Sequence, residues 1–225
     1  AAALLRDTAA LEEQVRAAFV KRGGLGYTPP TSDTFPPAAD FLAWVRACGA
    51  IPMLAWLDGT SAGESDPEAL LDRFCGLGVE AVNLIPERNW NVRDPAQASR
   101  NQAALHAFMA AAEARNLPVN IGTELNRDGL PFADDLAAPA LAPHAETFRR
   151  GAALLAGHTI LLRYAGFGYT GDPARARYGD DRAAKNRFFE AVGRRPPLTE
   201  PEAARLTALG PENAFDWLAA EAEKP

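Results

Sequence analysis

Residues 49–76 read GAIPMLAWLDGTSAGESDPEALLDRFCG and contain one complete unit of strand, loop and helix. The apolar run 51–57 has the length of a buried strand, and a polar, glycine-containing stretch follows it. Asp66 then offers a side chain that can cap a helix, and Pro67 suits the first helical position because a backbone N–H would lack a partner there. We therefore predict a strand over 51–57 and a helix from Pro67 to about Gly76.

The same unit recurs along the chain. Residues 81–85 form a second apolar run, Asp94 and Pro95 stand at the start of another helix, and residues 118–122 form a third run. A further apolar run at 159–164 gives a candidate fourth strand. Apolar strands that alternate with helices are typical of parallel sheets, because a helix supplies the crossover that parallel pairing needs. We predict an α/β fold, namely a complete or partial parallel β/α barrel of the TIM type.

The two ends of the chain differ from these repeating units. A helix is predicted near the N-terminus, over about 7–22, and a proline-rich connector follows at 27–37. Near the C-terminus, short helices that begin at Asp or Pro are predicted at 181–192, 201–209 and 211–222. We therefore predict a barrel-like domain over 1–180 and a helical C-terminal appendage over 181–225.

The charge balance argues against a nucleic-acid partner, and we expect a small-molecule ligand instead. The chain of 225 residues has 23 Lys and Arg against 29 Asp and Glu, a formal net charge of -6, so nucleic acid is not expected to bind. We expect no membrane partner and a cytoplasmic location, because no stretch approaches the roughly 20 apolar residues that cross a bilayer and no signal peptide is evident. The oligomeric state is left open. Cys48 and Cys75 lie beside apolar helical positions, so we predict that both are reduced and buried.

Polar side chains follow each of the first three predicted strands, where the functional groups of parallel α/β folds gather. Glu124 and Glu87 are the candidate catalytic residues, because paired carboxylates can act as general acid and base or share a cation. Arg88 is a candidate clamp for phosphate or carboxylate, with a surface salt bridge as the alternative. Ordinary loop polarity is the alternative for the others. The remaining candidate substrate-binding residues in these loops are Asn89, Asn126 and Asp58.

Two other patterns carry less weight. The stretch GFGYTG at 166–171 has the glycine spacing of a dinucleotide-binding loop, but such a loop lies inside a strand, helix and strand unit, and helices follow here. The three histidines show no paired metal-ligand spacing, so we predict structural roles for His106, His144 and His158.

Three stretches are similar in order and spacing to the PHP (polymerase and histidinol phosphatase) superfamily: VRACGAIPMLAW at 45–56, GVEAVN at 78–83 and LPVNIGTELN at 117–126. The resemblance implies a PHP-type barrel and a metal-dependent, phosphoesterase-like hydrolase, with a divalent metal as the candidate cofactor. The metal-ligand positions are degenerate, because the family's His, Asp and His are replaced by Trp56, Glu124 and Asn126. By this position in the family pattern, Trp56 joins the candidate substrate-binding residues.

The leading hypothesis is a PHP-like hydrolase that acts on a phosphorylated or other anionic small molecule. One alternative is a non-catalytic ligand-binding barrel that has lost the metal site. The other is a glycosidase-like enzyme with Glu87 and Glu124 as its paired carboxylates. Because the carboxyl ends of parallel strands lie together, all three hypotheses place a pocket there, lined by Asp58, Glu87, Glu124 and Asn126.

Overall fold

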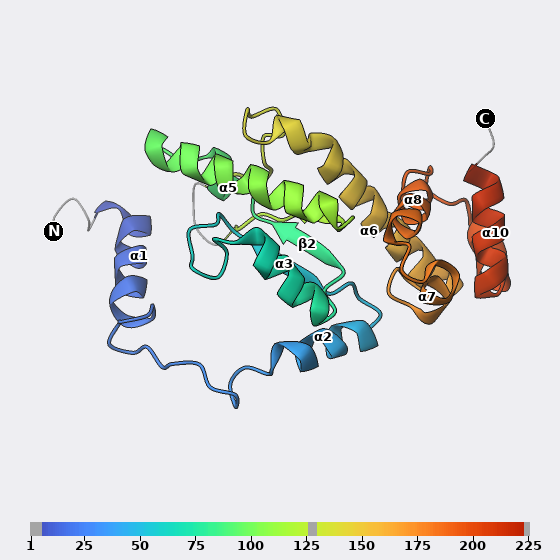
Figure 1. Cartoon of the computed structure of the whole chain (residues 1–225), viewed down its shortest axis with the longest axis horizontal. Coiled ribbons are helices and arrows are strands. Elements are labelled where there is room, and N and C mark those ends of the chain that lie inside the picture. The colour runs from blue at the N-terminus through green and yellow to red at the C-terminus, as the bar shows by residue number, and fades with distance from the viewer. Residues whose placement is uncertain (1–5, 126–129, 223–225) are drawn as a thin grey trace.

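The structure is a computed structural model that describes residues 6–125 and 130–222, and Figure 1 shows its elements. The strands among the described residues are β1 (Met53–Trp56), β2 (Ala81–Leu84) and β3 (Val119–Ile121). The helices before β3 are α1 (Thr8–Phe19), α2 (Ala38–Ala47), α3 (Pro67–Gly76), α4 (Glu87–Trp90) and α5 (Pro95–Ala114). A short 3₁₀ helix (Ala142–His144) precedes α6 (Ala145–Ala165), α7 (Asp172–Tyr178), α8 (Arg182–Gly193), α9 (Glu200–Ala208) and α10 (Pro211–Ala222).

The sheet is parallel and open, with the strand order β1-β2-β3. Leu54 pairs with Val82, and Val82 pairs with Val119, so the three predicted strands are parallel neighbours, as expected. The predicted barrel is wrong, because a barrel of the TIM type closes with eight strands and the described residues form a sheet of three strands among many helices. The fold is a helix-rich α/β arrangement around a small parallel sheet.

The candidate fourth strand at 159–164 is also wrong, because these residues lie inside α6. Leu161 is fully buried, and the Thr159 hydroxyl donates a hydrogen bond of 2.9 Å to the carbonyl of Leu155, one helical turn earlier. A short apolar run fits both a strand and a buried helix, and here the helix forms because the segment is enclosed by other helices.

Aspartate caps fix the starts of the helices that the sequence predicted. The Asp66 side chain accepts a hydrogen bond of 3.0 Å from the N–H of Ala69, and Asp94 accepts one of 2.9 Å from Ala96. Each cap is followed by proline at the first helical position, where the missing N–H costs nothing. Asp181 caps α8 in the same way. The predicted helices at the two ends of the chain are therefore confirmed, as α1 and as α8 to α10.

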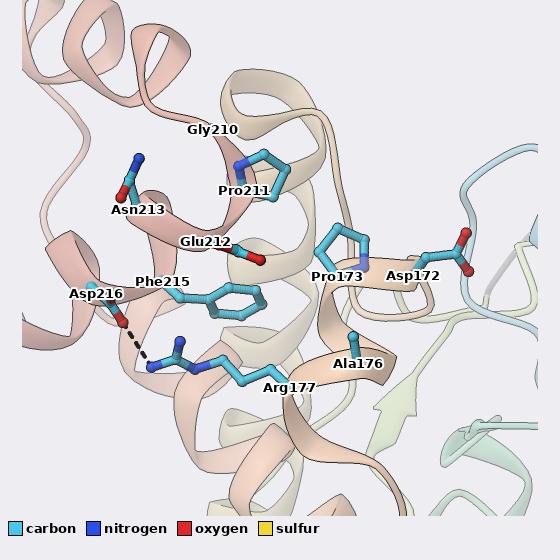
Figure 2. Close-up of a pocket in the computed structure, with 10 residues that line it drawn as sticks. All are labelled: Asp172, Pro173, Ala176, Arg177, Gly210, Pro211, Glu212, Asn213, Phe215 and Asp216. Atoms are coloured by element: carbon cyan, nitrogen blue, oxygen red, sulfur yellow. Dashed lines mark hydrogen bonds and ion pairs between the residues drawn. The ribbon is translucent and has the colours of Figure 1, made fainter.

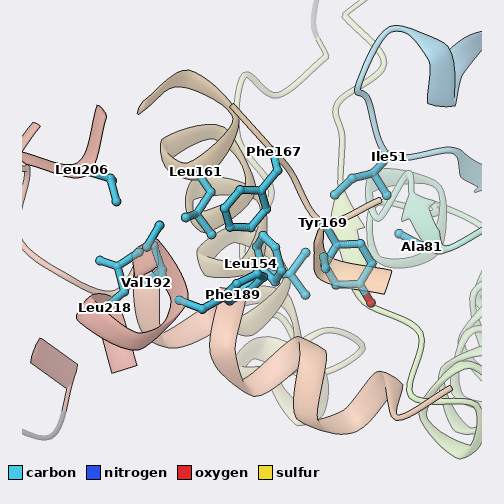
Figure 3. Packing of buried hydrophobic residues seen from close by; sticks show 13 residues of the cluster. Ile51, Ala81, Leu154, Leu161, Phe167, Tyr169, Phe189, Val192, Leu206 and Leu218 are labelled. Atoms are coloured by element: carbon cyan, nitrogen blue, oxygen red, sulfur yellow. The ribbon is translucent and has the colours of Figure 1, made fainter. Parts of the chain in front are cut away.

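The buried side chains form two clusters on opposite faces of the sheet. The first lies between the sheet and the helices α3 and α5, and its central residues include Trp56, Val82 and Phe108. The second lies between α6 and the C-terminal helices. Figure 3 shows Leu154 and Phe189 in this second cluster, and Figure 1 shows α7, α8 and α10 gathered near one end of α6.

Helix α6 contributes residues to both clusters, and a glycine lets it approach strand β3 closely. Phe148, near its start, packs in the sheet cluster, whereas Leu161 packs among the C-terminal helices. A Cβ atom at Gly151 would lie 2.6 Å from the carbonyl carbon of Val119 in β3, so only glycine permits this approach. The boundary predicted after residue 180 falls just before α8, and α8 packs along α6.

The GFGYTG loop wraps around a buried histidine. His158 of α6 accepts a hydrogen bond of 3.0 Å at Nδ1 from the N–H of Tyr169, and Gly166 ends α6 with φ of 75°. Nearby, Lys185 of α8 is buried, pairs with Glu80 at 2.9 Å and lies 4.0 Å from the centre of the Tyr169 ring. These contacts give the loop and its histidine a structural role.

Two further observations concern the surface. Cys48 and Cys75 are free thiols, but Cys48 is exposed and Cys75 is half-buried, so the predicted burial is wrong for Cys48. Cys48 follows the last residue of α2, whose face carries exposed Trp44 and little buried surface. Within the described ranges, none of the helices combines the length and apolar character that crossing a membrane requires.

Candidate functional site

The loops after the three strands surround one pocket of about 490 Å³, which we call the strand-end pocket. Asp58 follows β1, Glu87 begins α4 after β2, and Glu124 follows β3. All three line the pocket, which confirms that the carboxyl ends of the strands bring them together. Asn126 lies outside the described residues.

Arg88 holds the three loops together at the floor of the pocket. Its Nε donates a hydrogen bond of 2.8 Å to Oε2 of Glu124, and its Nη1 lies 3.6 Å from Oδ2 of Asp58. The hydrogen bond to Glu124 raises the pKa of the Arg88 guanidinium above its ordinary value, so the cation is permanent. Because two carboxylates already compensate this charge, Arg88 attracts a further anion less strongly than an unpaired arginine would.

Trp56 and Asn89 do not line the pocket, but they pack next to the strand ends that form it. Trp56 is fully buried and stacks on Phe108 with ring centres 4.6 Å apart, because strand alternation turns it toward α5. The Asn89 amide donates to the carbonyls of Leu57, at 2.9 Å, and Ile85, at 3.3 Å. Asn89 thus joins the end of β1 to the end of β2.

Asn101 of α5 is a wall residue that the sequence gave no reason to select. Only 2% of Asn101 is exposed, and its Nδ2 donates a hydrogen bond of 2.8 Å to the carbonyl of Arg88. Its Oδ1 is buried and has no hydrogen-bond partner among the described residues. A buried acceptor without a partner is unusual, because it loses its hydration without replacement.

The rim of the pocket is formed by α1 and by the loop that leads into α5. Glu13 forms ion pairs with Arg16, at 3.5 Å, and with Lys21. Arg93 and Gln97 also line the pocket and are exposed. No residue of α1 is buried, so this helix covers the rim without entering the core.

Asp134, which the sequence analysis did not select, places a further carboxylate near Glu87. Oδ1 of Asp134 accepts a hydrogen bond of 2.8 Å from the indole N–H of Trp90. Burial raises the pKa of the Asp134 carboxyl, the Trp90 bond opposes this change, and the charge of Glu87 adds to it. Glu87 itself accepts a hydrogen bond of 3.1 Å from the Asn91 amide. Carboxylates with different environments can divide acid and base roles between them.

The residues of the pocket do not fit the metal centre that the family resemblance implies. The described residues contain no group of three or more His, Cys, Asp or Glu side chains placed to hold a metal ion. Between Asp58 and Glu124 stands the guanidinium of Arg88, which takes the place a cation would need. The one close histidine pair, with His106 Nδ1 2.7 Å from His144 Nε2, lies between α5 and the start of α6.

A larger pocket of about 720 Å³ lies between α7 and α10 (Figure 2). Arg177 pairs with Asp216 at 2.9 Å and lies 5.0 Å from the centre of the Phe215 ring, so this cation already has partners. None of the sequence-predicted site residues lines it. We therefore regard the smaller strand-end pocket as the candidate site, because buried and charged groups of several loops meet there.

Comparison with known proteins gave no match to a family model, to a curated protein or to a solved structure. The resemblance to the PHP superfamily therefore stays a prediction from three short stretches. The geometry of the strand-end pocket is therefore the basis for the function proposed below.

Proposed function

We propose that this protein binds a small polar molecule with an anionic group in the strand-end pocket. The observation that supports the proposal most directly is the meeting of Asp58, Arg88 and Glu124 in one pocket beside the unpartnered amide oxygen of Asn101. Three loops contribute, and such convergent polar groups at the carboxyl ends of parallel strands are typical of ligand sites.

The cationic side chains of the rim are the groups that would meet the anion. Arg16, Lys21 and Arg93 bring three positive charges, and Glu13 brings one negative charge. Their exposure keeps the attraction modest, so shape and hydrogen bonding deeper in the pocket would supply the rest of the affinity. The binding should weaken as salt is added, because salt screens exposed charges.

The test is a thermal-shift and calorimetric titration with inorganic phosphate, citrate, a hexose phosphate and caproate. A compound at a hundred times its Kd stabilises the folded chain by about 2.7 kcal/mol. Arg93→Gln should weaken binding roughly two- to fivefold, as expected for one exposed charge. The matched control is Arg187→Gln, at an exposed position on α8, which should bind like the wild type. If no compound binds, or if both variants behave alike, the proposal is wrong.

A second candidate function is hydrolysis of the bound molecule by Glu87 and Glu124. It is favoured by the different environments of the two side chains, since Glu124 pairs with Arg88 while Glu87 stands beside Asp134. Release of nitrophenol from nitrophenyl phosphate and nitrophenyl glycosides would measure it, with and without added Mg²⁺ or Mn²⁺. Glu124→Gln should abolish this release and leave the far-UV circular dichroism unchanged, because it removes a charge but little volume.

Location and partners also stay proposals. We propose a cytoplasmic protein without a nucleic-acid or membrane partner, on the strength of the net charge of -6 and the apolar pattern of the chain. Cell fractionation would test the location, and binding to DNA, RNA and lipid vesicles would test the partners.

A further inference from the structure

We propose that the ligand of the strand-end pocket is a small zwitterion, which places a protonated amine at the floor and a carboxylate or phosphate at the rim. The inference rests on the proposed function and names the chemical class of its ligand. It follows from the way in which charge and burial divide the pocket.

The floor of the pocket is partly buried and negative. It contains the carboxylates of Asp58, Glu87 and Glu124 against the single guanidinium of Arg88, a formal charge of −2. The Asp58 side chain is 12% exposed and that of Glu124 is 32% exposed. Charges in such partly buried places act more strongly than charges at the surface, because water screens them less.

The rim of the pocket is exposed and positive. Its three cations and the single carboxylate of Glu13 sum to a formal charge of +2. The side chains of Arg16 and Lys21 are 53% and 50% exposed, and Arg93 is exposed as well. The described residues that line the pocket sum to a formal charge of zero, but the floor and the rim have opposite signs.

Asn101 determines which kind of ligand group fits the floor. Because its Oδ1 is an acceptor without a partner among the described residues, the ligand group that meets it has to be a donor. A carboxylate or a fully ionised phosphate ester offers acceptors only, and the floor carboxylates would repel its charge. An ammonium offers three donors and a positive charge, so it satisfies both Asn101 and its acidic neighbours.

A ligand with a single charge, positive or negative, interacts favourably with only one end of the pocket. An acid without an amine meets the rim cations and leaves Asn101 unsatisfied, and an amine without an acid does the reverse. A neutral hydroxyl donates to Asn101 but gains little from the floor charge, because charge-assisted hydrogen bonds are about twice as strong as neutral ones. The zwitterion should therefore bind about tenfold or more tightly than any of these.

The experiment compares matched compounds by isothermal titration calorimetry on the whole chain. The zwitterions are γ-aminobutyrate, ε-aminocaproate and ω-aminocaprylate, which span several distances between amine and acid. Caproate, hexylamine and ω-hydroxycaproate are the single-charge and neutral-donor controls. We expect at least one of the zwitterions to bind about tenfold more tightly than caproate and ω-hydroxycaproate.

Variants of floor residues test whether the floor causes the preference for zwitterions over caproate. Asn101→Leu and Glu87→Gln should each reduce the preference for the zwitterion over caproate severalfold. Glu87 is less buried than Asn101 and has one hydrogen bond, from Asn91, so Glu87→Gln serves if Asn101→Leu fails to fold. Glu200→Gln, at an exposed position on α9, is the charge-matched control and should retain the full preference.

The outcomes separate this inference from the proposed function. If caproate or phosphate binds and the zwitterions bind no better, the zwitterion inference is overturned while the proposed function stands. Equal binding of ω-hydroxycaproate and ε-aminocaproate also overturns it, since charge would then be irrelevant. If the preference exists and Glu87→Gln leaves it intact, the floor is not its source and the inference is again wrong. If no anion or zwitterion binds the wild type, the proposed function itself fails.

Discussion

Replacing Gly151 by alanine tests whether α6 lies as close to the sheet as described. In an isolated helix this change would be favourable by about 1 kcal/mol, because alanine restricts the unfolded chain and suits a helix interior. In the folded protein the new Cβ would lie 2.6 Å from the carbonyl carbon of Val119, and closer still to its oxygen. The two effects have opposite signs, so the measured sign decides which one dominates.

The clash is the larger effect. Ordinary contacts of a Cβ begin near 3.4 Å and the new Cβ would lie 1.8 Å from the Val119 oxygen, so α6 would have to move away from β3 by about 1.5 Å. The obstacle is backbone, which cannot rotate away, and overpacking of this kind costs about 1–3 kcal/mol or more. The movement also loosens Phe148 and Leu154, which are 2% and 1% exposed. We expect Gly151→Ala to lower the free energy of unfolding by about 2–4 kcal/mol.

Urea unfolding followed by far-UV circular dichroism measures the change. The matched control is Gly76→Ala at the end of α3, where a new Cβ meets nothing within 4 Å and the free energy of unfolding should stay equal or rise by up to about 1 kcal/mol. If Gly151→Ala were as stable as the wild type or as this control, the close contact between α6 and β3 would be refuted.

Three further outcomes follow from buried or exposed groups. Lys185→Met should lower the free energy of unfolding by about 3 kcal/mol, because it leaves the Glu80 carboxylate without its partner; no loss would contradict the buried pair. Burial lowers the pKa of His158 in the folded state, so the unfolded chain binds more protons and stability should fall as the pH drops below about 6.5. Urea midpoints against pH should show a smaller slope for His158→Asn, and an unchanged slope would exclude His158 as a cause. Cys48 should react with a thiol reagent faster than Cys75, whose pKa is raised by burial, and the opposite order in peptide mapping would contradict the exposures.

The sequence predicts the strand and helix units well because their signals are local. An Asp cap followed by proline specifies a helix start within the residues themselves, and both Asp66 and Asp94 act as predicted. Short apolar runs bounded by polar loops likewise located β1, β2 and β3. Their parallel order follows from the helical crossovers between them.

Local sequence patterns could not predict whether the sheet closes into a barrel. A repeated strand and helix unit fits a barrel and an open sheet equally, and the choice depends on what covers the sheet. Here α6 packs against the edge strand β3, and the run 159–164 that could have extended the sheet is part of that helix. A helix buried between two clusters has apolar residues on several sides, so its period is hard to distinguish from that of a strand.

The site was predictable where it depends on strand ends and unpredictable elsewhere. Asp58, Glu87 and Glu124 follow strands directly, and topology alone brings them together. Asn101 lies nearly two turns into the long helix α5, and Asp134 lies in a loop far along the chain, so no local pattern connects either to the site. Trp56 was placed in the site by resemblance, whereas the pleat of β1 turns it into the core.

Few contacts stabilise helix α1 in its folded position. Its 12 residues bury no side chain, and an isolated helix of this length is marginal in water. Arg16 lines the rim nonetheless, so an anion held there would also hold the helix, and occupancy of the pocket would be coupled to order in the N-terminal segment. Amide hydrogens of α1 should therefore exchange rapidly in the free protein and slowly in the occupied one, and part of the binding energy would be spent on this ordering.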